Sequence, residues 1–243
     1  MTLLNVENLD VRHGLLQAVR GVSLAIAKGE TVALVGANGA GKTTLLRAIA
    51  GAHLPTAGRV QMNGVEITAV PAFKRVGMGI ALVPEGRKLF AQMTVEENLI
   101  LARSAGRPGR WTIDAVLAAF PNLIPRRHAK CGTLSGGEQQ ATSIGRALMT
   151  NPDILLLDEV SLGLSPLAVD RVYASLQSLI GGGATIVLVE QDLRRAMKVA
   201  NRIICMLEGH IVLEGKASAI TRDEVTQAYF GLRGGAHQQA AAR

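Results

Sequence analysis

A glycine-rich run at residues 36–43 has the composition of a phosphate-binding loop. It follows the apolar run 31–35 and precedes a helical pattern at 44–50, so we expect it where a buried strand turns into a helix. Glycines there let backbone N–H groups close around phosphate oxygens, while the Lys42 ammonium can neutralise the β- and γ-phosphates and the Thr43 hydroxyl can bind Mg²⁺. The alternative is a glycine-rich turn beside a solvated lysine. The run predicts a P-loop, with these candidate nucleotide-binding residues: Gly36, Ala37, Asn38, Gly39, Ala40, Gly41, Lys42, Thr43 and Thr44.

Two acidic residues follow a second apolar run, Ile-Leu-Leu-Leu at 154–157. This run suits a strand covered on both faces, and charge appears only at its C-terminal end, where open α/β sheets bind their ligands. We therefore expect Asp158 to hold Mg²⁺ and Glu159 to polarise the attacking water as a general base. Taken alone, adjacent acids after a strand would indicate a solvated loop, but a P-loop upstream favours catalysis, with Lys42 as a further catalytic residue.

The segment 134–140, Leu-Ser-Gly-Gly-Glu-Gln-Gln, predicts a second anion site. It stands just before the helical stretch 138–149, so it forms another helix N-terminus with few side chains in the way. Its candidate ligand-binding residues are Ser135, Gly136, Gly137 and Glu138. Because one molecule has one P-loop, the simplest explanation is that this helix start closes on ATP held by a partner subunit. The sequence therefore predicts a functional dimer.

With these motifs in this order, the chain resembles an ATP-binding cassette (ABC) ATPase over residues 1–232. The resemblance implies an α/β P-loop NTPase fold of the ABC type, in which two ATPase subunits meet head to tail and sandwich two ATP molecules. Each ATP lies between the P-loop of one subunit and residues 134–140 of the other. By position, Asp158 is the Mg²⁺ aspartate and Glu159 the catalytic base, and ATP and Mg²⁺ are the implied ligands.

Further segments point to one subfamily. The strings at 83–90 and 93–99 are similar to the ATPases of branched-chain amino-acid importers, and those at 161–166, 189–192 and 228–231 resemble the smaller of the two ATPases in such importers. The resemblance implies an energy-coupling subunit at the cytoplasmic face of the inner membrane. Its partners would be two transmembrane permease subunits, a sister ATPase or a second copy, and an external solute-binding protein that acts through the permease.

Other functions remain open. The same fold could serve another solute, such as urea or short amides for import, or lipid or lipopolysaccharide for export. A soluble ABC ATPase acting on DNA or ribosomes is disfavoured, because such proteins usually carry two cassettes or a long coiled-coil insertion. A P-loop kinase or switch GTPase is disfavoured, because its chemistry needs no Ser-Gly-Gly sequence like that at 135–137.

Four positions of the candidate site differ from the usual residues of the family, and one of them is Val160, which follows Glu159 where Pro is usual. Glu85 stands where most members carry Gln, and we count it as a candidate Mg²⁺ ligand. Gln191 stands where most members place a His that contacts the γ-phosphate; it can donate a hydrogen bond but carries no charge, and we count it as a candidate catalytic residue. His13 stands where an aromatic residue, usually Tyr, stacks on adenine. Imidazole is a smaller platform, and a strand-end surface residue is the alternative.

The composition narrows the choice of partner. A net charge of +7 on 243 residues suits nucleic acid or an anionic membrane surface. Only 3% of the residues are aromatic, which leaves few platforms for stacking single-stranded nucleic acid, so we expect a membrane-facing role and no nucleic-acid partner. Two cysteines indicate neither a disulfide framework nor a zinc site. The uncharged stretch 172–189 contains glycines at 181–183 and should form a helix and a strand rather than a membrane span.

We expect one ABC ATPase domain at 1–232, with a tail at 233–243 that is disordered. Helical spacing predicts a helical subdomain inserted at about 89–150, in which Thr94 and Glu97 form a capping box. The strand-like runs that predict an antiparallel β subdomain are 3–11, 22–26 and 59–62. The strands that alternate with helices, as a parallel or mixed sheet core requires, are 154–157, 184–189 and 203–207.

Overall fold

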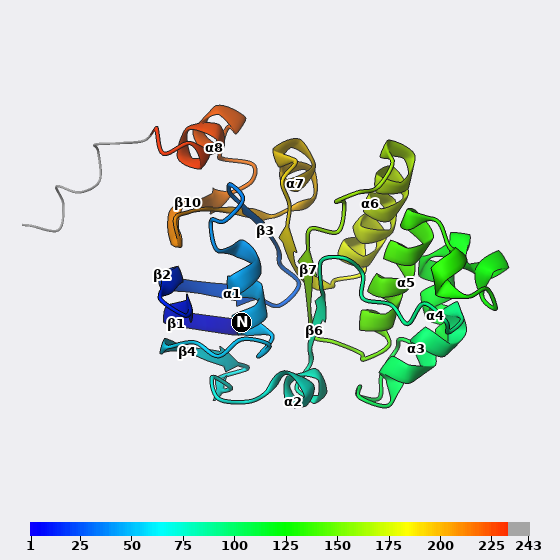
Figure 1. Cartoon of the computed structure of the whole chain (residues 1–243). Helices are drawn as coiled ribbons and strands as arrows, with labels where there is room; N and C mark the ends of the chain where they lie inside the picture. The colour runs from blue at the N-terminus through cyan, green and yellow to red at the C-terminus, as the bar shows by residue number, and fades with distance from the viewer. Residues whose placement is uncertain (233–243) are drawn as a thin grey trace, which may run out of the picture.

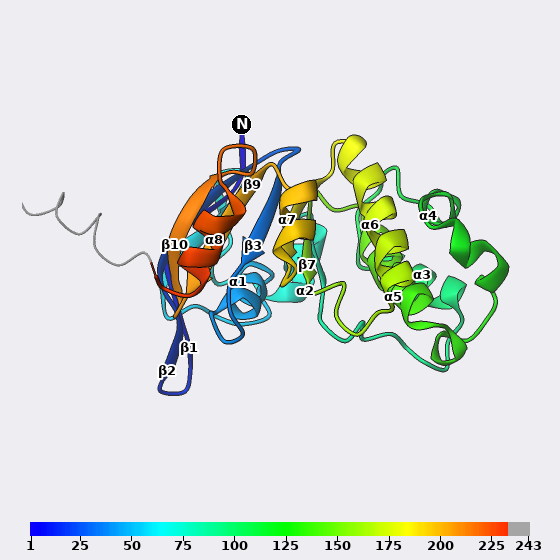
Figure 2. The same ribbon diagram turned by 90° about the horizontal axis from the view of Figure 1, so that it is seen from above.

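The computed structural model describes residues 1–232, and the tail expected at 233–243 lies outside the described residues. The described strands form two sheets (Figure 1). In both views the smaller sheet lies at one side of the molecule, the larger sheet passes through the middle, and the helices α3, α4 and α5 lie at the opposite side (Figures 1 and 2). The α/β fold class predicted from the sequence is confirmed.

The smaller sheet is antiparallel, with strand order β2-β1-β4-β5. Residues Val22, Leu24 and Ile26 of β2 are buried while their neighbours are exposed, so one face of the sheet packs on the protein core. The predicted antiparallel subdomain is therefore present, and its strands extend further than the sequence indicated. They are β1 (Thr2–His13), β2 (Leu16–Ala27), β4 (Ala57–Met62) and β5 (Val65–Glu66).

The larger sheet has strand order β10-β9-β3-β8-β7-β6 and is mixed, because β10 alone runs antiparallel to its neighbour among the described strands. Every residue of β3, β7 and β8 is buried, as expected for strands covered on both faces. Because β3, β8 and β7 are neighbouring parallel strands, their C-terminal ends are adjacent. They lie at the edge where open α/β sheets bind ligands. The strands are β3 (Thr31–Val35), β6 (Ile80–Val83), β7 (Ile154–Asp158), β8 (Thr185–Val189), β9 (Arg202–Leu207) and β10 (His210–Lys216).

Helices cover both faces of the larger sheet. In β7, Ile154 and Leu156 belong to the apolar cluster that includes α1 and the smaller sheet, whereas Leu155 and Leu157 belong to the cluster that includes α5 and α6. This alternation is the period-2 pattern of a strand between two layers. The helices outside the insertion are α1 (Lys42–Ile49), α2 (Ala72–Gly77), α6 (Pro166–Gly181), α7 (Leu193–Val199) and α8 (Arg222–Tyr229).

A group of helices is inserted between β6 and β7 and stands apart from the sheets in Figure 2. The capping box predicted at its first helix is confirmed. The Thr94 hydroxyl accepts from the Glu97 N–H at 3.2 Å, and the Glu97 carboxylate accepts from the Thr94 N–H at 2.7 Å. The inserted elements are α3 (Val95–Arg103), α4 (Ile113–Ala119), η1 (Pro121–Arg126), η2 (Cys131–Thr133) and α5 (Gly136–Leu148).

The uncharged stretch 172–189 divides between α6 and β8, as predicted. Gly182 ends α6, and Gly183 takes a positive φ of 78° in the turn before β8. No helix within residues 1–232 is long and apolar enough to cross a membrane.

The fully buried Arg75 of α2 closes the C-terminal end of α1, a contact that the sequence analysis did not foresee. Its guanidinium donates to the carbonyl oxygens of Ala48 at 2.9 Å and Ile49 at 2.7 Å, and also to those of Val70 at 2.8 Å and Thr68 at 2.9 Å. Burial lowers the pKa of Arg75 to about 10. The last carbonyls of a helix lack partners within it, so Arg75 stabilises the helix that begins at the P-loop.

Candidate nucleotide-binding site

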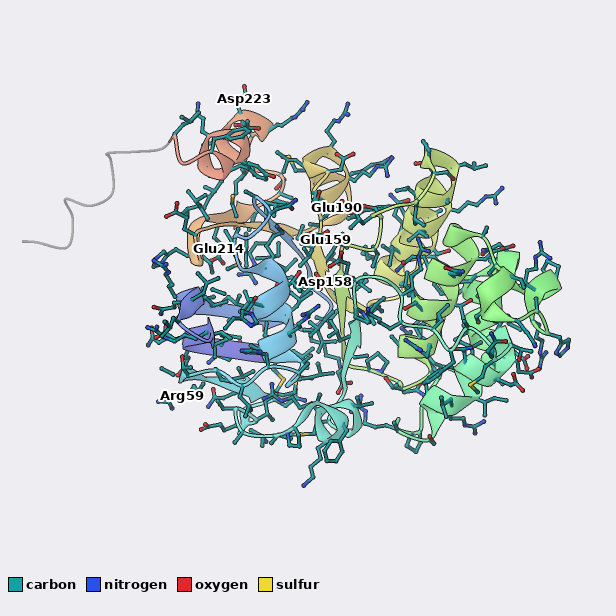
Figure 3. The ribbon with its side chains drawn as sticks, in the orientation of Figure 1. Arg59, Asp158, Glu159, Glu190, Glu214 and Asp223 are labelled. Carbon is teal, nitrogen blue, oxygen red and sulfur yellow. The ribbon has the colours of Figure 1, made fainter. Side chains whose placement is uncertain are left out.

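A cavity of about 480 Å³ opens beside the P-loop, at the C-terminal edge of the larger sheet. Figure 3 shows Asp158 and Glu159 at the end of β7, with Glu190 nearby at the end of β8. The cavity brings together residues that the sequence analysis identified separately and that lie far apart in the chain. They are His13, Lys42, Thr43, Glu85, Glu159 and Gln191.

The P-loop passes so close to neighbouring backbone that two of its positions require glycine. A Cβ on Gly36 would lie 2.2 Å from the Met206 carbonyl oxygen, and one on Gly41 would lie 2.2 Å from the Ala18 carbonyl oxygen. Both glycines also have positive φ, 147° and 100°. At Gly39, φ is 82° and nothing lies within 4 Å of an added Cβ. Gly36 and Gly41 thus allow the loop backbone to pack closely against β9 and β2, respectively. At Gly39 the space beside the loop backbone is open.

Lys42 lies inside the curve of this loop and is only 4% exposed. Its ammonium donates to the carbonyl oxygens of Gly36 at 2.7 Å and Ala37 at 2.9 Å. Burial lowers the pKa of Lys42, and the nearby Glu159 and Asp158 carboxylates oppose this effect. The geometry therefore concentrates positive charge at the loop, where phosphate oxygens would lie.

Thr43 and Asp158 meet although they are far apart in the sequence. The Thr43 hydroxyl donates to Asp158 Oδ1 at 2.9 Å, and Asp158 is 1% exposed. Burial raises the pKa of Asp158, the hydrogen bond from Thr43 opposes the rise, and the neighbouring Glu159 adds to it. A buried carboxylate costs free energy unless a cation or a full set of donors satisfies it.

The chemistry of these groups fits Mg²⁺. Asp158 Oδ2 is buried and has no hydrogen-bond partner among the described residues, so one carboxylate oxygen is left for a cation. The structure brings together no group of three or more His, Cys, Asp or Glu side chains suited to a metal within residues 1–232. Mg²⁺ does not need one, because it keeps several waters and is commonly held by one or two carboxylates together with substrate phosphates. Glu85 faces the same cavity and offers a further oxygen.

Gln191 connects the two sides of the cavity. Its amide nitrogen lies 2.9 Å from Glu159 Oε2 and 3.2 Å from Asn38 Oδ1, and donates a hydrogen bond to each. Glu159 itself has a φ of +48°, which is uncommon for a residue with a side chain. The arrangement holds a carboxylate beside the P-loop, at a place where it could accept a proton from water.

His13 lies at the rim of the cavity, where the end of β1 meets α1. Its Nε2 is 3.1 Å from the Thr44 hydroxyl, and its ring packs against His53 with a centroid distance of 4.4 Å and a tilt of 52°. His53 was not singled out from the sequence, and no local pattern marks it. The exposed imidazole of His13 is a small apolar face in the position predicted for an adenine platform.

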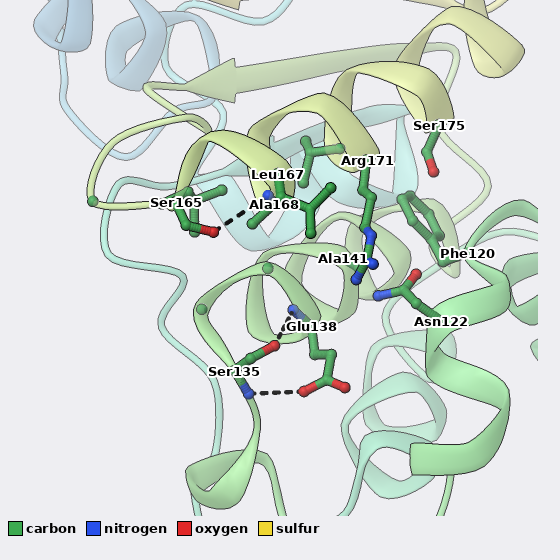
Figure 4. A pocket seen from close by; sticks show the side chains of 15 residues that line it. Phe120, Asn122, Ser135, Glu138, Ala141, Ser165, Leu167, Ala168, Arg171 and Ser175 are labelled. Carbon is green, nitrogen blue, oxygen red and sulfur yellow. Dashed lines mark hydrogen bonds between the residues drawn. The ribbon is translucent and has the colours of Figure 1, made fainter.

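The predicted second anion site lies in a different cavity, of about 320 Å³, between α5 and α6 (Figure 4). Ser135 caps α5 in a capping box with Glu138: the serine hydroxyl accepts from the Glu138 N–H at 3.4 Å, and the glutamate accepts from the Ser135 N–H at 2.8 Å. Arg126 pairs with Glu138 at 3.2 Å. The residues that line the P-loop cavity do not include Ser135, Gly136, Gly137 or Glu138 among those described. One chain therefore keeps the two sites apart.

Glu190 is a buried acid beside the site that the sequence analysis did not single out. It directly follows the all-buried strand β8, just as Glu159 follows β7. The signal that identified Asp158 and Glu159, charge at the end of an apolar run, was therefore present at Glu190 too.

Comparison with known protein sequences places the chain among transporter ATPases. The ABC transporter family profile matches residues 19–161. The chain is 40% identical over 232 residues to the high-affinity branched-chain amino acid transport ATP-binding protein BraG of Pseudomonas aeruginosa, covering 94% of this chain and 100% of that protein. It is 35% identical over 225 residues to the probable branched-chain amino acid transport ATP-binding protein LivF of Archaeoglobus fulgidus, covering 91% and 95% of the two chains.

Solved structures of ATP-binding cassettes have the same fold. The ADP conformation of MJ1267, an ATP-binding cassette of an ABC transporter, superposes with a TM-score of 0.80 at 27% identity and covers 95% of each chain. A dimeric post-hydrolysis state of the ATP-binding cassette MJ0796, bound to ADP and Pi, gives a TM-score of 0.78 at 26% identity and covers 90% of this chain and 100% of that one.

Proposed function

The chain belongs to the ABC transporter family of ATPases, and on this basis we propose that it powers the import of branched-chain amino acids such as leucine, isoleucine and valine. The ATPase part is carried by one observation: Lys42, Thr43 and Glu159 line a single cavity, with Asp158 hydrogen-bonded to Thr43. The amino-acid part is supported by the 40% identity to BraG and by the residues at 83–90.

Within this proposal, the P-loop N–H groups and the start of α1 bind the ATP phosphates, and Lys42 neutralises the β- and γ-phosphates. Thr43 and Asp158 hold Mg²⁺, with Glu85 as a further oxygen ligand. When bound, this ion neutralises charge that develops on the transferred phosphoryl group. His13 packs on the adenine at the rim of the cavity.

Glu159 then acts as the general base. Its carboxylate takes a proton from the attacking water, a role that typically accelerates a reaction by about 10²- to 10⁴-fold. Gln191 keeps the carboxylate in place through its hydrogen bonds to Glu159 and Asn38. Because Gln191 remains neutral, it positions groups and does not exchange protons.

A second ATPase subunit completes the site. Residues 135–138 line a cavity that is separate from the P-loop cavity of the same chain. We therefore propose that they close on ATP bound by a partner, either a sister ATPase or a second copy. ATP binding would join the two subunits and hydrolysis would separate them. This cycle is what couples the chemistry to movement of the permease.

The permease would dock in a groove of about 270 Å³ between β6, α3 and α5. Phe90 and Leu101 line it and are 51% and 45% exposed, so the groove presents apolar side chains to solvent. Arg146 lies against the Phe90 ring, 6.0 Å from its centroid. A short segment with apolar side chains and an acidic residue, exposed by the cytoplasmic face of a permease, would complement this groove.

The first test concerns ATP. Lys42→Ala should abolish productive ATP binding, because the remaining N–H groups cannot neutralise the phosphates. Glu159→Gln should still bind ATP but stall hydrolysis in a closed dimer, because the amide cannot take a proton. ATP turnover by Glu159→Gln equal to that of the wild type would contradict the assignment of the base.

The second test concerns the solute. Uptake of labelled leucine, with urea as the comparison solute, is measured in the native cell carrying Lys42→Ala in this chain. Loss of leucine uptake alone supports the branched-chain assignment. Unchanged leucine uptake in a strain without other leucine transporters contradicts it, and a loss of urea uptake would favour the amide importer instead.

A further inference from the structure

A buried carboxylate lies beside the proposed reaction site. Glu190 is 2% exposed and stands at the end of β8, close to Glu159 in Figure 3. The Ser161 hydroxyl lies 2.9 Å from each of its oxygens, and the phenol of Tyr173 donates to Oε2. The backbone N–H groups of Gln191 and Asp192 donate to Oε1 at 2.9 and 3.1 Å. Four donor groups thus converge on one side chain.

The donors come from three different segments of the chain. Ser161 belongs to the loop that follows Glu159, Tyr173 to α6, and Gln191 and Asp192 to the connection between β8 and α7. Burial, with the adjacent Glu190 carboxylate as the next cause, raises the pKa of Tyr173, so the phenol keeps its proton and remains a donor. A carboxylate can only accept hydrogen bonds, so its two oxygens match this set of donors.

The residues held by this carboxylate include those proposed to act on water. Glu159 has a φ of +48°, a strained conformation for a residue with a side chain, which persists only where its surroundings enforce it. Its own backbone contacts are the Glu159 N–H to the Val189 carbonyl at 3.2 Å and the Leu162 N–H to the Glu159 carbonyl at 3.1 Å. Ser161, inside that turn, is tied to Glu190, and the side chain of Gln191 is tied to Glu159 at 2.9 Å.

We propose that Glu190 is a positioning residue for ATP hydrolysis, which fixes the turn at 159–161 and the backbone of Gln191 so that Glu159 keeps its orientation toward the attacking water. Glu190 does not line the cavity that contains Lys42, so it acts through Glu159 and Gln191 and not on ATP. The inference rests on the proposed function of the site as an ATPase.

The test compares Glu190→Gln and Ser161→Ala with the wild type in steady-state ATP hydrolysis by the assembled transporter. Glu190→Gln replaces one acceptor oxygen by a donor, so two donors face each other and the turn loosens. We expect kcat to fall about 10- to 100-fold, since small misplacements of catalytic groups cost this much, while KM for ATP stays within about twofold. Ser161→Ala removes one donor and leaves the carboxylate, and we expect kcat to fall about 3- to 10-fold.

Glu30→Gln is the matched control. Glu30 is a partly buried carboxylate that pairs with Arg202 at 2.8 Å before β3, at the opposite edge of the same sheet. The Glu30→Gln substitution removes the same charge far from the proposed ATP site, so we expect the kcat of this variant to equal that of the wild type. If kcat of Glu30→Gln falls as far as kcat of Glu190→Gln, the effect is a general structural one and the inference is overturned. The inference is also overturned if Glu190→Gln shows a higher KM for ATP together with a loss of thermal stability.

Two further outcomes distinguish a failure of the positioning role of Glu190 from a failure of the proposed catalytic base, Glu159. If Glu159→Gln stalls hydrolysis but Glu190→Gln turns over ATP like the wild type, the positioning role alone is wrong. If Glu159→Gln turns over ATP like the wild type, the proposed base is wrong and the inference fails with it. Should Glu190→Gln not fold, Ser161→Ala decides: an unchanged kcat overturns the inference, and a lower kcat with unchanged KM supports it.

Discussion

The Arg87 guanidinium donates a hydrogen bond to the Gln139 side chain at 2.9 Å and so joins the loop after β6 to the first turn of α5. The same loop is held from further along α5, where Arg146 donates to the Lys88 carbonyl oxygen at 2.7 Å. Arg87 and Lys88 have φ values of 62° and 47°, an unusual pair for residues with side chains. The helix that starts at residues 135–138 therefore holds a strained loop beside the proposed ATP site.

Arg87→Ala should uncouple transport from hydrolysis. Without the contact to Gln139, movement of the loop would reach α5 less fully, so leucine uptake should fall more than ATP turnover. We expect the number of ATP molecules hydrolysed per leucine transported to rise about fivefold in membrane vesicles that contain the whole transporter. The control is Arg59→Ala, which removes an exposed arginine paired with Glu7 on the smaller sheet. Equal losses of uptake and turnover in Arg87→Ala would contradict the prediction.

Asp158→Asn should stabilise the protein in the absence of nucleotide. Burial raises the pKa of Asp158 above its ordinary value of 3.8, and a carboxyl that binds its proton more tightly in the folded state loses stability as pH rises through the raised pKa. The amide carries no charge, so the variant should have a higher Tm than the wild type at neutral pH. The difference should disappear below about pH 4, where the wild-type carboxyl is protonated. A Tm difference that does not depend on pH would contradict this explanation.

The same raised pKa predicts how Mg²⁺ dependence changes with pH. Mg²⁺ binds the ionised carboxylate of Asp158, so protons compete with the metal ion. The Mg²⁺ concentration that gives half-maximal ATP turnover should therefore increase as pH falls toward the raised pKa. Titrations of Mg²⁺ at several pH values, with saturating ATP, measure this. A half-maximal concentration that stays constant down to the acid limit of folding would argue against Asp158 as the metal ligand.

Arg75→Met should destabilise the protein without entering the ATP site. The substitution keeps apolar volume but removes four hydrogen bonds to carbonyl oxygens, of which those to Ala48 and Ile49 at the end of α1 are buried. We expect the free energy of unfolding to fall by about 3 kcal/mol, because unpaired buried polar groups cost more than a typical hydrogen bond contributes. Urea denaturation measures the change. Arg59→Met, at an exposed position, should change it by no more than about 0.5 kcal/mol.

His13→Tyr should tighten ATP binding. A phenol ring offers a larger face than imidazole at the rim of the cavity, and aromatic stacking contributes roughly 0.5–1.5 kcal/mol, which corresponds to an affinity gain of about 2- to 10-fold. Calorimetric titration with ATP in the Glu159→Gln background, which prevents turnover, measures the Kd. The control is His210→Tyr, at an exposed position of β10. An unchanged Kd in His13→Tyr would favour the alternative that His13 is a surface residue.

Much of the fold could be predicted because local patterns report which faces of an element are buried. The apolar run before Asp158 became β7, fully buried, and the helical spacing after residue 89 became the inserted helices. Three strands were missed, β5 (Val65–Glu66), β6 (Ile80–Val83) and β10 (His210–Lys216); of these, β5 is exposed on both of its residues and pairs with β4. A prediction from periodicity does not detect an element whose side chains bury nothing.

The sequence by itself determined the P-loop, the acids at the end of β7 and the glycine-rich start of α5, because the spacing of glycines and charges around strand and helix ends is enough to define them. Only the tertiary structure decided which of these groups meet. The order β3-β8-β7 places Gln191 at hydrogen-bond distance from Glu159, and Glu190 at hydrogen-bond distance from Ser161, although no local pattern relates these residues. Residues far apart in the chain come together through the order of the strands and the packing of the elements. Periodicity in the sequence indicates which side chains are buried, but not which residues they contact.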